Sequence, residues 1–268
     1  MKKFKYLVLC LIALTLTLTA CGQESASSED SLTIGVSPTP HGEIVEGLKD
    51  EFKKEGLDVK VVNFDDYVQP NLQLEAGDID ANFFQHEAYL KDFCEERGIK
   101  DLVNLGAIHL EPIGVYSKSL KSLDELKDGD EVIIPNDPSN GARALLLLQK
   151  AGLIKLADEN NLKATEQDIV ENPKNLKFVP MEAASIPKTY GDATIGIINS
   201  NYAIANGLNP IDDAIYSEDK DAPYANIIAV KEENKGEEKF QKLLQVMTSE
   251  KCKELIKAKF QDDIVPVF

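Results

Sequence analysis

The sequence predicts an α/β protein of two lobes, and three observations support this. Short β-branched runs alternate with longer helical patterns from residue 32 to the C-terminus, which is the rhythm of βα units. The alternation occurs in two successive sets, and strand-like segments connect the sets in both directions. A chain that crosses twice between lobes forms a hinged pair with a cleft, where small ligands usually bind. We therefore expect each lobe to be a mainly parallel sheet flanked by helices.

The N-terminal residues combine positive charge, an apolar run and a cysteine. They are Lys2, Lys3 and Lys5, the run Tyr6 to Leu14, and Leu18-Thr19-Ala20-Cys21. This pattern resembles a bacterial lipoprotein signal, whose cleavage leaves the cysteine as the new N-terminus. Threonines interrupt the apolar stretch, which is short for the roughly 20 residues of a membrane span. We therefore predict a signal peptide over residues 1–20 and a lipid on Cys21 that anchors the protein to the extracytoplasmic face of the cell membrane.

The segment after Cys21 is too polar to form a core. Gly22 to Ser31 contains only Ala26 as an apolar side chain, so we expect residues 21–31 to be a flexible linker. Cleavage removes three lysines and no acids, which takes the formal net charge of the chain from −17 to −20. Nucleic acids and bare anionic surfaces require positive stripes, so we exclude both as partners.

Cysteine usage does not indicate a metal or redox site. Cys10 leaves with the signal and Cys21 takes the lipid, so only Cys94 and Cys252 remain. Their spacing is compatible with a disulfide and equally with two free thiols. The sequence has no CxxC pair, which is the usual zinc or redox signature.

The first set of elements builds one lobe. In chain order the pattern predicts a strand at 32–37, a helix at 43–55, a strand at 57–64, a helix at 67–76 closed by Gly77, a strand at 79–84 and a helix at 87–97 that stops at Gly98. Residues 102–116 are strand-like, but Pro112 and Gly114 interrupt them, which indicates a crossing or hinge. We assign residues 32–112 and 227–268 to lobe I.

The second set builds the other lobe. It comprises a strand at 131–134, a helix at 142–151 ended by Gly152, a strand at 176–179, a helix at 181–190 and a strand at 193–198. Residues 224–230 are again strand-like, and two amphipathic helices finish the chain. One face of these helices carries Phe240, Leu243, Leu244 and Met247. We assign residues 113–226 to lobe II.

The strongest internal signal is the stretch 134–148, IPNDPSNGARALLLL. Prolines force a loop after a strand, and Ser139 or Asn140 can cap the helix that follows. Four successive leucines make this helix apolar on every side, so Arg143 is conspicuous within it. We expect Arg143 to lie in the first turn, where its guanidinium and the free backbone N–H groups could together receive a carboxylate. The alternative is a structural salt bridge to a distant acid, and the sequence favours neither.

Aromatic residues gather where a strand ends and a helix begins. The stretch 81–90, ANFFQHEAYL, contributes Phe84, His86 and Tyr89, and Tyr67 precedes it. Ligands usually bind at this edge of an α/β sheet, so the rings could wall a pocket for an apolar, polarizable side chain. Sulfur against a ring edge contributes about 0.3–1.5 kcal/mol. The alternative is that a phenylalanine fills the core and His86 caps a helix, which fits one phenylalanine better than the whole group.

Two asparagines follow later strands, Asn201 in the stretch 199–203 and Asn226 shortly after Pro223-Tyr224. Each side chain offers both a donor and an acceptor, which suits a zwitterion with an ammonium and a carboxylate. Taken singly, such residues are more often helix caps or turn residues.

No motif predicts catalysis. The sequence has no G-x-S-x-G, no H-E-x-x-H and no P-loop, and His41, His86 and His109 are too scattered for a metal site evident from sequence. We therefore expect no enzymatic activity, no metal and no cofactor.

Together with the N-terminal signal, these stretches resemble the methionine-binding lipoproteins of ABC importers, the NlpA-type family. The likeness runs from Leu32 to the C-terminus. Its specific parts are Tyr67-Val68-Gln69-Pro70-Asn71, the stretch 81–86, the stretch 135–140 with Arg143, Asn199 to Ala203, and Pro223-Tyr224 with Asn226. A departure is Glu87-Ala88 after His86, where relatives often carry a proline; it should alter the helix entry more than the ligand class.

The resemblance implies a two-lobed periplasmic-binding-protein fold of type II. The cleft would hold methionine, and the protein, a monomer, would present it to an ABC permease driven by its ATPase. The implied ligand-binding set is Arg143 for the carboxylate, Asn201 and Asn226 for the other backbone polar groups, Tyr67, Phe84, His86 and Tyr89 around the thioether, and Asn140 beside them. The alternatives are the same scaffold tuned to another small amino acid, a short peptide or a sulfur compound, and a surface adhesion protein.

The lipid anchor can be tested by substitution. Cys21→Ala should release the protein from membranes, because the thiolate that carries the lipid is lost. Cell fractionation measures this, with Cys94→Ala as a control that stays membrane-bound. Continued membrane fractionation of Cys21→Ala would contradict the prediction.

Overall fold

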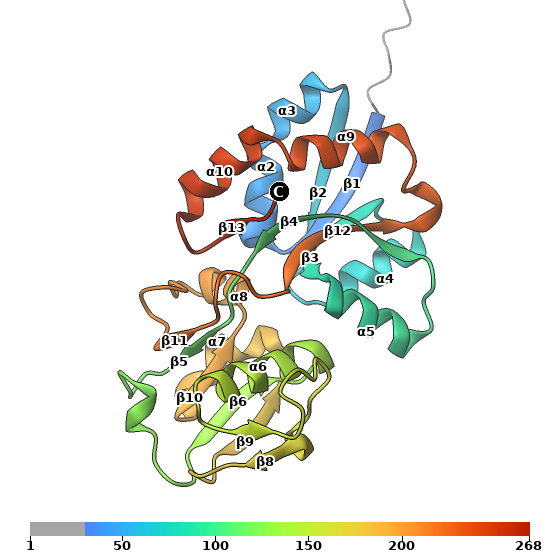
Figure 1. The fold of residues 1–268 in the computed structure, drawn as a ribbon. Helices are drawn as coiled ribbons and strands as arrows, with labels where there is room; N and C mark the ends of the chain where they lie inside the picture. Colours follow the sequence, from blue (N-terminus) through green and yellow to red (C-terminus); the bar gives the residue numbers. More distant parts are fainter. Residues whose placement is uncertain (1–29) are drawn as a thin grey trace, which may run out of the picture.

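A computed structural model describes residues 30–268 and shows two α/β lobes joined by crossing segments (Figure 1). The predicted signal peptide, Cys21 and most of the predicted linker lie outside the described residues. Within residues 30–268, no helix combines the length and the apolar character needed to cross a membrane.

The larger sheet has six strands in the order β13-β4-β12-β3-β1-β2. They are β1 (Asp30–Val36), β2 (Leu57–Asn63), β3 (Ala81–His86), β4 (Leu102–Leu110), β12 (Ala225–Lys231) and β13 (Val265–Pro266). The block β2-β1-β3 is parallel, as the βα pattern predicts, whereas β12 runs antiparallel to both β3 and β4. β13 is antiparallel to β4; the sequence pattern did not predict this strand. The sheet is therefore antiparallel where the returning chain joins it.

β1 begins two residues before the predicted start. Asp30 and Ser31, which we assigned to the linker, pair with Leu57 and Asp58 of β2. Their side chains are exposed, so apolar content does not mark them as strand. Backbone pairing to the adjacent strand extends β1 beyond its apolar part.

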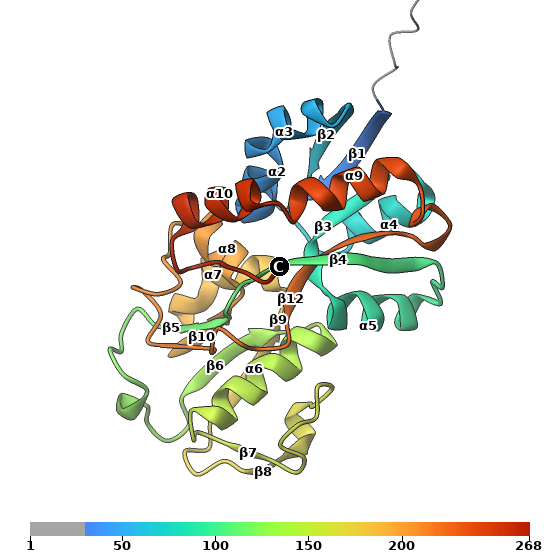
Figure 2. The ribbon, with the colours of Figure 1, turned by 45° about the horizontal axis from the view of Figure 1, so that its top comes forward.

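Helices cover both faces of the larger sheet (Figures 1 and 2). They are α2 (Glu43–Gly47), α3 (Lys49–Lys54), α4 (Gln69–Ala76), α5 (Glu87–Arg97), α9 (Glu238–Met247) and α10 (Glu250–Phe260), with a π-helical turn, η1, at Pro38–Gly42. The helix predicted at 43–55 is broken at Leu48, whose ψ is 7°. The helix predicted from residue 67 begins at Gln69, because the Asp66 carboxylate accepts hydrogen bonds from the backbone N–H groups of Val68 and Gln69.

The second sheet has five strands in the order β11-β5-β10-β6-β9. They are β5 (Gly114–Tyr116), β6 (Glu131–Pro135), β9 (Lys177–Met181), β10 (Ile195–Ile198) and β11 (Tyr216–Ser217). β9-β6-β10 is parallel, and β5 is antiparallel to β10 and β11. The remaining elements of this part are α6 (Pro138–Lys150), α7 (Ile186–Thr189), α8 (Ser200–Ala205) and the small hairpin of β7 (Lys155–Leu156) and β8 (Ile169–Glu171). Short 3-10 turns occur at Leu123–Glu125, Glu166–Asp168, Ala183–Ser185, Tyr190–Asp192 and Glu232–Asn234.

The helix predicted at 181–190 is wrong. Met181 belongs to β9 and pairs with Pro135, and a 3-10 turn separates it from the four-residue α7. Pro187 lies in the first turn of α7, which is the place where a proline without an N–H group is tolerated. A continuous helix through this residue would lose a backbone hydrogen bond.

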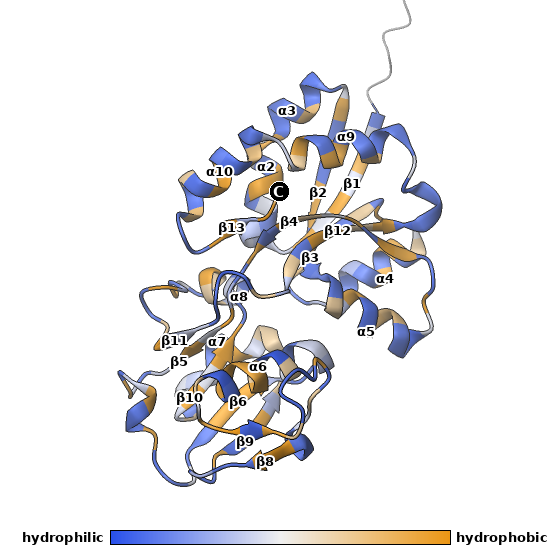
Figure 3. Cartoon of the chain, viewed as in Figure 1, coloured by the Kyte–Doolittle hydropathy of each residue, from blue (hydrophilic) through white to orange (hydrophobic). Residues whose placement is uncertain are grey.

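Two crossings connect the sheets. The outgoing chain leaves β4 at Leu110 and enters β5 at Gly114, and the return runs from β11 to β12 (Figure 1). The interruption by Pro112 and Gly114 thus marks a crossing, as predicted. Apolar residues concentrate on the strands and on the helix faces that pack against them (Figure 3). The two-lobed α/β architecture that the sequence predicts is confirmed.

The two remaining cysteines are free. Cys252 is fully buried in the core of the larger lobe, and Cys94 is partly exposed on α5. The sequence left open a disulfide or two free thiols, and the structure shows two free thiols.

Candidate functional site

A cavity lies between the two sheets. It is lined by Tyr67, Phe84, Gln85, His86, Tyr89, Glu111, Asn140, Arg143, Asn199, Ser200, Asn201 and Asn226. All eight residues that the sequence analysis proposed for ligand binding are in this set.

One side of the cavity is an aromatic wall. Tyr67, Phe84 and Tyr89 pack with their ring centroids 5.6–6.0 Å apart. The hydroxyl of Tyr89 donates to the backbone carbonyl of Tyr67 at 3.0 Å, which fixes the loop before α4. The neighbouring Phe83 points to the core and is fully buried. The core-filling alternative therefore applies to Phe83 and not to Phe84.

His86 both caps a helix and lines the cavity. Its Nδ1 accepts the backbone N–H of Tyr89, which caps the N-terminus of α5. Nε2 then carries the proton and donates to Oδ1 of Asn140, 3.3 Å away. Burial lowers the pKa of His86 to about 3, and the positive charge of Arg143 acts in the same direction. The imidazole is therefore neutral at physiological pH.

Arg143 is buried and forms a salt bridge to a distant acid, which is one of the two interpretations that the sequence left open. Its Nε donates to the carboxylate of Glu218 at 3.0 Å, and Nη2 donates to the same carboxylate and to the backbone carbonyl of Glu111. Its guanidinium also stacks over the ring of Tyr224, 4.3 Å from the ring centroid. Within residues 30–268 Nη1 donates no hydrogen bond, and Arg143 lines the cavity. The ion pair thus fixes the guanidinium and leaves one end available to an anion.

The predicted start of the Arg143 helix is wrong. α6 begins at Pro138, and Asp137 is its N-cap because its carboxylate accepts the backbone N–H of Asn140 at 2.9 Å. Proline fits the first helical turn, and aspartate is a strong cap. Arg143 consequently lies in the second turn, and Asp137 already satisfies one N–H group that was expected to join it in binding an anion.

The asparagines are oriented by their neighbours. Oδ1 of Asn201 accepts from the hydroxyl of Tyr67 at 2.5 Å, and Oδ1 of Asn226 lies 3.1 Å from Nε2 of His41. Both side chains therefore keep their Nδ2 groups as donors toward the cavity. Asn140 is different, because Asp137, His86 and Asn199 engage both ends of its amide. Besides lining the cavity, Asn140 thus holds His86 and Asn199 in place.

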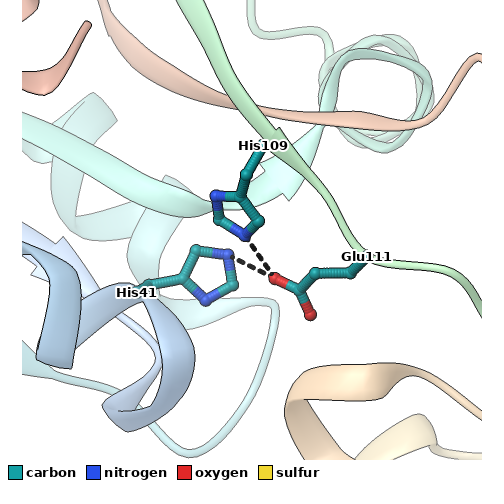
Figure 4. A group of neighbouring side chains, drawn as sticks. All are labelled: His41, His109 and Glu111. Atoms are coloured by element: carbon teal, nitrogen blue, oxygen red, sulfur yellow. Dashed lines mark hydrogen bonds and ion pairs between the residues drawn. The ribbon is translucent and has the colours of Figure 1, made fainter. Parts of the chain in front are cut away.

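Sequence reasoning missed four lining residues: Gln85, Glu111, Asn199 and Ser200. Glu111 is the most informative of them, because its carboxylate is buried next to two histidines (Figure 4). Its Oε1 lies 3.1 Å from Nε2 of His41 and 2.7 Å from Nε2 of His109. One feature of the sequence could have identified Glu111: an acid lies directly between Leu110 and Pro112, where an apolar strand ends.

Burial sets the protonation of this cluster. It lowers the pKa of His41 to about 4 and that of His109 to about 3. Burial also raises the pKa of Glu111, against the opposing effects of His41, Arg143 and the backbone N–H of Asn201. Neutral imidazoles can each donate from Nε2 to the Glu111 carboxylate.

Among residues 30–268, His41, His109 and Glu111 are the group whose ligand atoms lie close enough to hold a metal ion, within 4.8 Å of one another. However, Nδ1 of both histidines is buried without a hydrogen-bond partner. A metal-bound histidine normally anchors its other nitrogen to a carboxylate, a carbonyl or water. The cluster therefore fits a hydrogen-bonded carboxylate better than a metal site.

Contacts across the cleft hold the lobes together. Tyr67 donates to Asn201, and the hydroxyl of Tyr202 reaches the backbone carbonyl of Asp65 at 3.3 Å. At the mouth of the cleft, Nζ of Lys163 lies 3.0 Å from Asp92 and 2.7 Å from Glu95 on α5. The cavity is thus enclosed by a closed arrangement of the lobes.

Comparison with known proteins gives concordant matches. The family model described as NlpA lipoprotein matches residues 32–268. A D-methionine-binding lipoprotein MetQ of Salmonella typhi is 48% identical over 243 residues, which cover 90% of this chain and 89% of that protein.

Solved structures are similar in fold and sequence. A nutrient-binding protein of Burkholderia cenocepacia bound to methionine has a TM-score of 0.85 and 44% identity, covering 88% of this chain and 100% of the other. A periplasmic substrate-binding protein of an ABC transporter from Coxiella burnetii has a TM-score of 0.84 and 40% identity, with the same coverage.

The buried histidines predict a specific pH response. His41, His86 and His109 are all the histidines of the chain, and we expect their imidazoles to stay neutral at pH 5, where an unfolded histidine is mostly protonated. The unfolded state then binds more protons than the native state, so stability should fall as pH drops from about 6.5 toward 4. NMR of histidine-labelled protein measures the titration, with the urea-unfolded protein as control. A native histidine with a midpoint near 6.5 would contradict the prediction.

Proposed function

The chain belongs to the NlpA lipoprotein family, and we propose that it is an extracytoplasmic receptor that captures methionine and delivers it to an ABC importer. The observation that carries the proposal is the cavity itself, which combines a buried guanidinium, two asparagine donors and an aromatic wall between the two lobes. The names of the matched relatives, which include methionine-binding proteins and a component of an ABC transporter, support the same assignment.

The cavity offers separate environments for the two ends of methionine. Nη1 of Arg143 and the Nδ2 groups of Asn201 and Asn226 are donors that suit the ligand carboxylate and neighbouring polar atoms. The ring edges of the aromatic wall suit the thioether, since sulfur contributes about 0.3–1.5 kcal/mol per aromatic contact. We propose Tyr67, Phe84, His86, Tyr89, Asn140, Arg143, Asn201 and Asn226 as the ligand-binding residues.

His86 contributes to this site as a neutral group. Its two nitrogens are already engaged by Tyr89 and Asn140, so it offers the ligand its ring surface and no free donor. A neutral imidazole beside Arg143 also avoids a second positive charge near the thioether end of the cavity.

Ligand capture would operate by closure of the lobes. We take residues 32–112 with 227–268 as lobe I, which supplies the aromatic wall, and residues 113–226 as lobe II, which supplies Arg143 and Asn201. A ligand that touches both lobes only when they are shut binds the closed state more tightly and shifts the population toward it. A binding role of this kind requires no turnover of the ligand.

The family assignment and the N-terminal pattern together support the cellular location and the partners that we propose. Cleavage after residue 20 and lipidation of Cys21 would tether the monomeric receptor to the extracytoplasmic face of the membrane, where a permease and its ATPase would accept the ligand. The acidic net charge, −17 for the whole chain, gives no basis for binding nucleic acid.

Direct binding measurements test the proposal. Calorimetry with a panel of amino acids, short peptides and sulfur compounds should show methionine as the tightest ligand, unchanged after incubation. Mass spectrometry of material released on denaturation provides an independent readout of the ligand carried from cells. Preference for another compound, or conversion of methionine to a product, would contradict the proposed function.

The role of Arg143 can be tested by substitution. Arg143→Ala removes a charge-assisted contact and leaves Glu218 unpaired, so methionine binding should weaken by about 2–5 kcal/mol. Calorimetry measures the change, and Lys150→Ala, on the same helix but exposed, is the control that keeps native affinity. Native affinity in Arg143→Ala would show that the carboxylate site is misassigned.

A further inference from the structure

Three buried side-chain amides, the amide cluster, join α4 to β3. Asn71 and Asn82 are fully buried, and Gln85 is 3% exposed. Asn71 lies in the first turn of α4, and the other two lie on β3. Burying an amide costs free energy unless its donors and acceptors are hydrogen-bonded. Apolar side chains would fill this part of the lobe at lower cost if packing were the only requirement.

The three amides satisfy one another. Nδ2 of Asn71 donates to Oε1 of Gln85 at 2.9 Å, and Nε2 of Gln85 donates back to Oδ1 of Asn71 at 2.7 Å. Nδ2 of Asn82 donates to the same Oδ1 at 2.8 Å and to the backbone carbonyl of Pro70 at 3.2 Å. Oδ1 of Asn82 accepts from Gln85 at 2.9 Å. A buried network satisfied in this way makes its surroundings rigid and specifies one packing.

A β-bulge in β3 makes the cluster possible. Gln85 and Phe83 pair with consecutive residues of β12 (225–231), so Phe84 between them pairs with no residue of that strand. Successive side chains of a regular strand point to opposite faces, which would separate Asn82 from Gln85. The extra residue brings both amides to one side, where they bond to each other. Bulges often lie next to functional sites and change the direction of a side chain, and Phe84 is a lining residue of the cavity.

The cluster connects the two segments that supply the aromatic wall. Tyr67 precedes α4 and Phe84 lies in the bulge of β3, and their ring centroids are 5.7 Å apart. The hydrogen bonds from Asn82 to Asn71 and to the carbonyl of Pro70 fix the start of α4 against β3. They thereby fix the position of one ring relative to the other. Tyr67 also reaches the other lobe through its hydroxyl.

We propose that Asn71 and Asn82 are positioning residues, which act through Gln85 and the bulge to hold the rings of Tyr67 and Phe84 at the separation that selects the side chain of the ligand. The inference rests on the proposed function, since it concerns the specificity of the same site. Of the three amides, which all belong to the described residues, only Gln85 lines the cavity. The two asparagines therefore act without contact to the ligand.

Two ligands that differ at one position of the side chain test the role of Asn82. Norleucine carries a methylene where methionine carries sulfur, and the amino-acid ends are the same. Sulfur gains from well-placed ring edges, so the wild type should bind methionine at least about fivefold more tightly than norleucine. Asn82→Ala should weaken methionine binding at least about tenfold and lower the preference to about twofold or less. Calorimetry measures both ligands.

Leu74→Ala is the matched control for stability. Leu74 is fully buried on the same helix and packs in an apolar cluster with residues of the sheet. Its truncation leaves a cavity in the core, so it should lower stability, as Asn82→Ala does, and keep the preference for methionine. Urea unfolding measures the stability of each variant. Asn82→Ser, which keeps one donor, should shift the preference in the same direction by less, and it replaces Asn82→Ala if that variant does not fold.

A double-mutant cycle shows whether Asn82 acts through the aromatic wall. Phe84→Ala removes the ring that the bulge presents to the cavity. Because a positioning residue has no effect once its target is gone, Asn82→Ala should change methionine affinity by less than about twofold in the Phe84→Ala background. Asn71→Ala should give the same result, since both asparagines belong to one network.

The outcomes separate this inference from the function beneath it. Failure of the wild type to bind methionine would overturn the proposed function and this inference with it. With methionine bound, three results would overturn only the positioning role: equal wild-type affinity for norleucine, a preference unchanged in Asn82→Ala or equally changed in Leu74→Ala, and an undiminished effect of Asn82→Ala in the Phe84→Ala background. Unfolding of both Asn82 variants without urea would assign the cluster to fold stability instead.

Discussion

The site depends on one buried guanidinium. Removing a charged group from water costs several kcal/mol unless it is paired and hydrogen-bonded, and Arg143 is only 3% exposed. Its partners come from both crossings of the chain: the backbone of Glu111 on the way out, and Glu218 and Tyr224 on the way back. The need to satisfy Arg143 therefore fixes the two hinge segments relative to α6. The position of the cleft between the lobes follows from the same contacts.

The surrounding polar groups are consistent with that constraint. All three histidines near the cavity are buried and have lowered pKa values, so they add no positive charge beside Arg143. Each uses Nε2 to orient an oxygen, on Asn140, Asn226 or Glu111. Buried networks of this kind are stable only when nearly every member is satisfied. The cavity is consequently a preorganised set of donors and one carboxylate, and a ligand has little reorganisation to drive.

Local patterns predicted most of the fold because they report local physics. Gly77 and Gly98 end α4 and α5 with positive φ values of 82° and 69°, as their positions after periodic stretches indicated. The clustering of Tyr67, Phe84 and Tyr89 followed from the rule that strand ends meet at one edge of a sheet. Two of the elements that the sequence missed were decided by tertiary pairing: β13 and the first residues of β1 are strands only because a partner strand lies beside them.

The same difference between local patterns and tertiary contacts explains which residues of the site could be predicted from the sequence. Asn201 and Asn226 were identified from composition and resemblance, but their free donors depend on Tyr67 and His41, which lie 134 and 185 residues away in the chain. Glu111 was missed because a single acid after a strand carries no periodic signal. Its contacts come from His41 in η1 and His109 in β4. Glu218 was likewise invisible, although an ion pair for Arg143 was one of the alternatives.

The stability of the closed arrangement depends on weak ion pairs at the exposed edge of the cleft and on stronger contacts inside it. Lys163 pairs with Asp92 and Glu95 across the mouth, but its side chain is 60% exposed, and solvent and salt screen such pairs. Tyr67 and Asn201 meet inside, where the amide of Asn201 is buried. In the mechanism we propose, a ligand that contacts Arg143 and the aromatic wall adds these contacts only in the shut state. Weak rim contacts therefore keep opening accessible, so that capture and release can both occur.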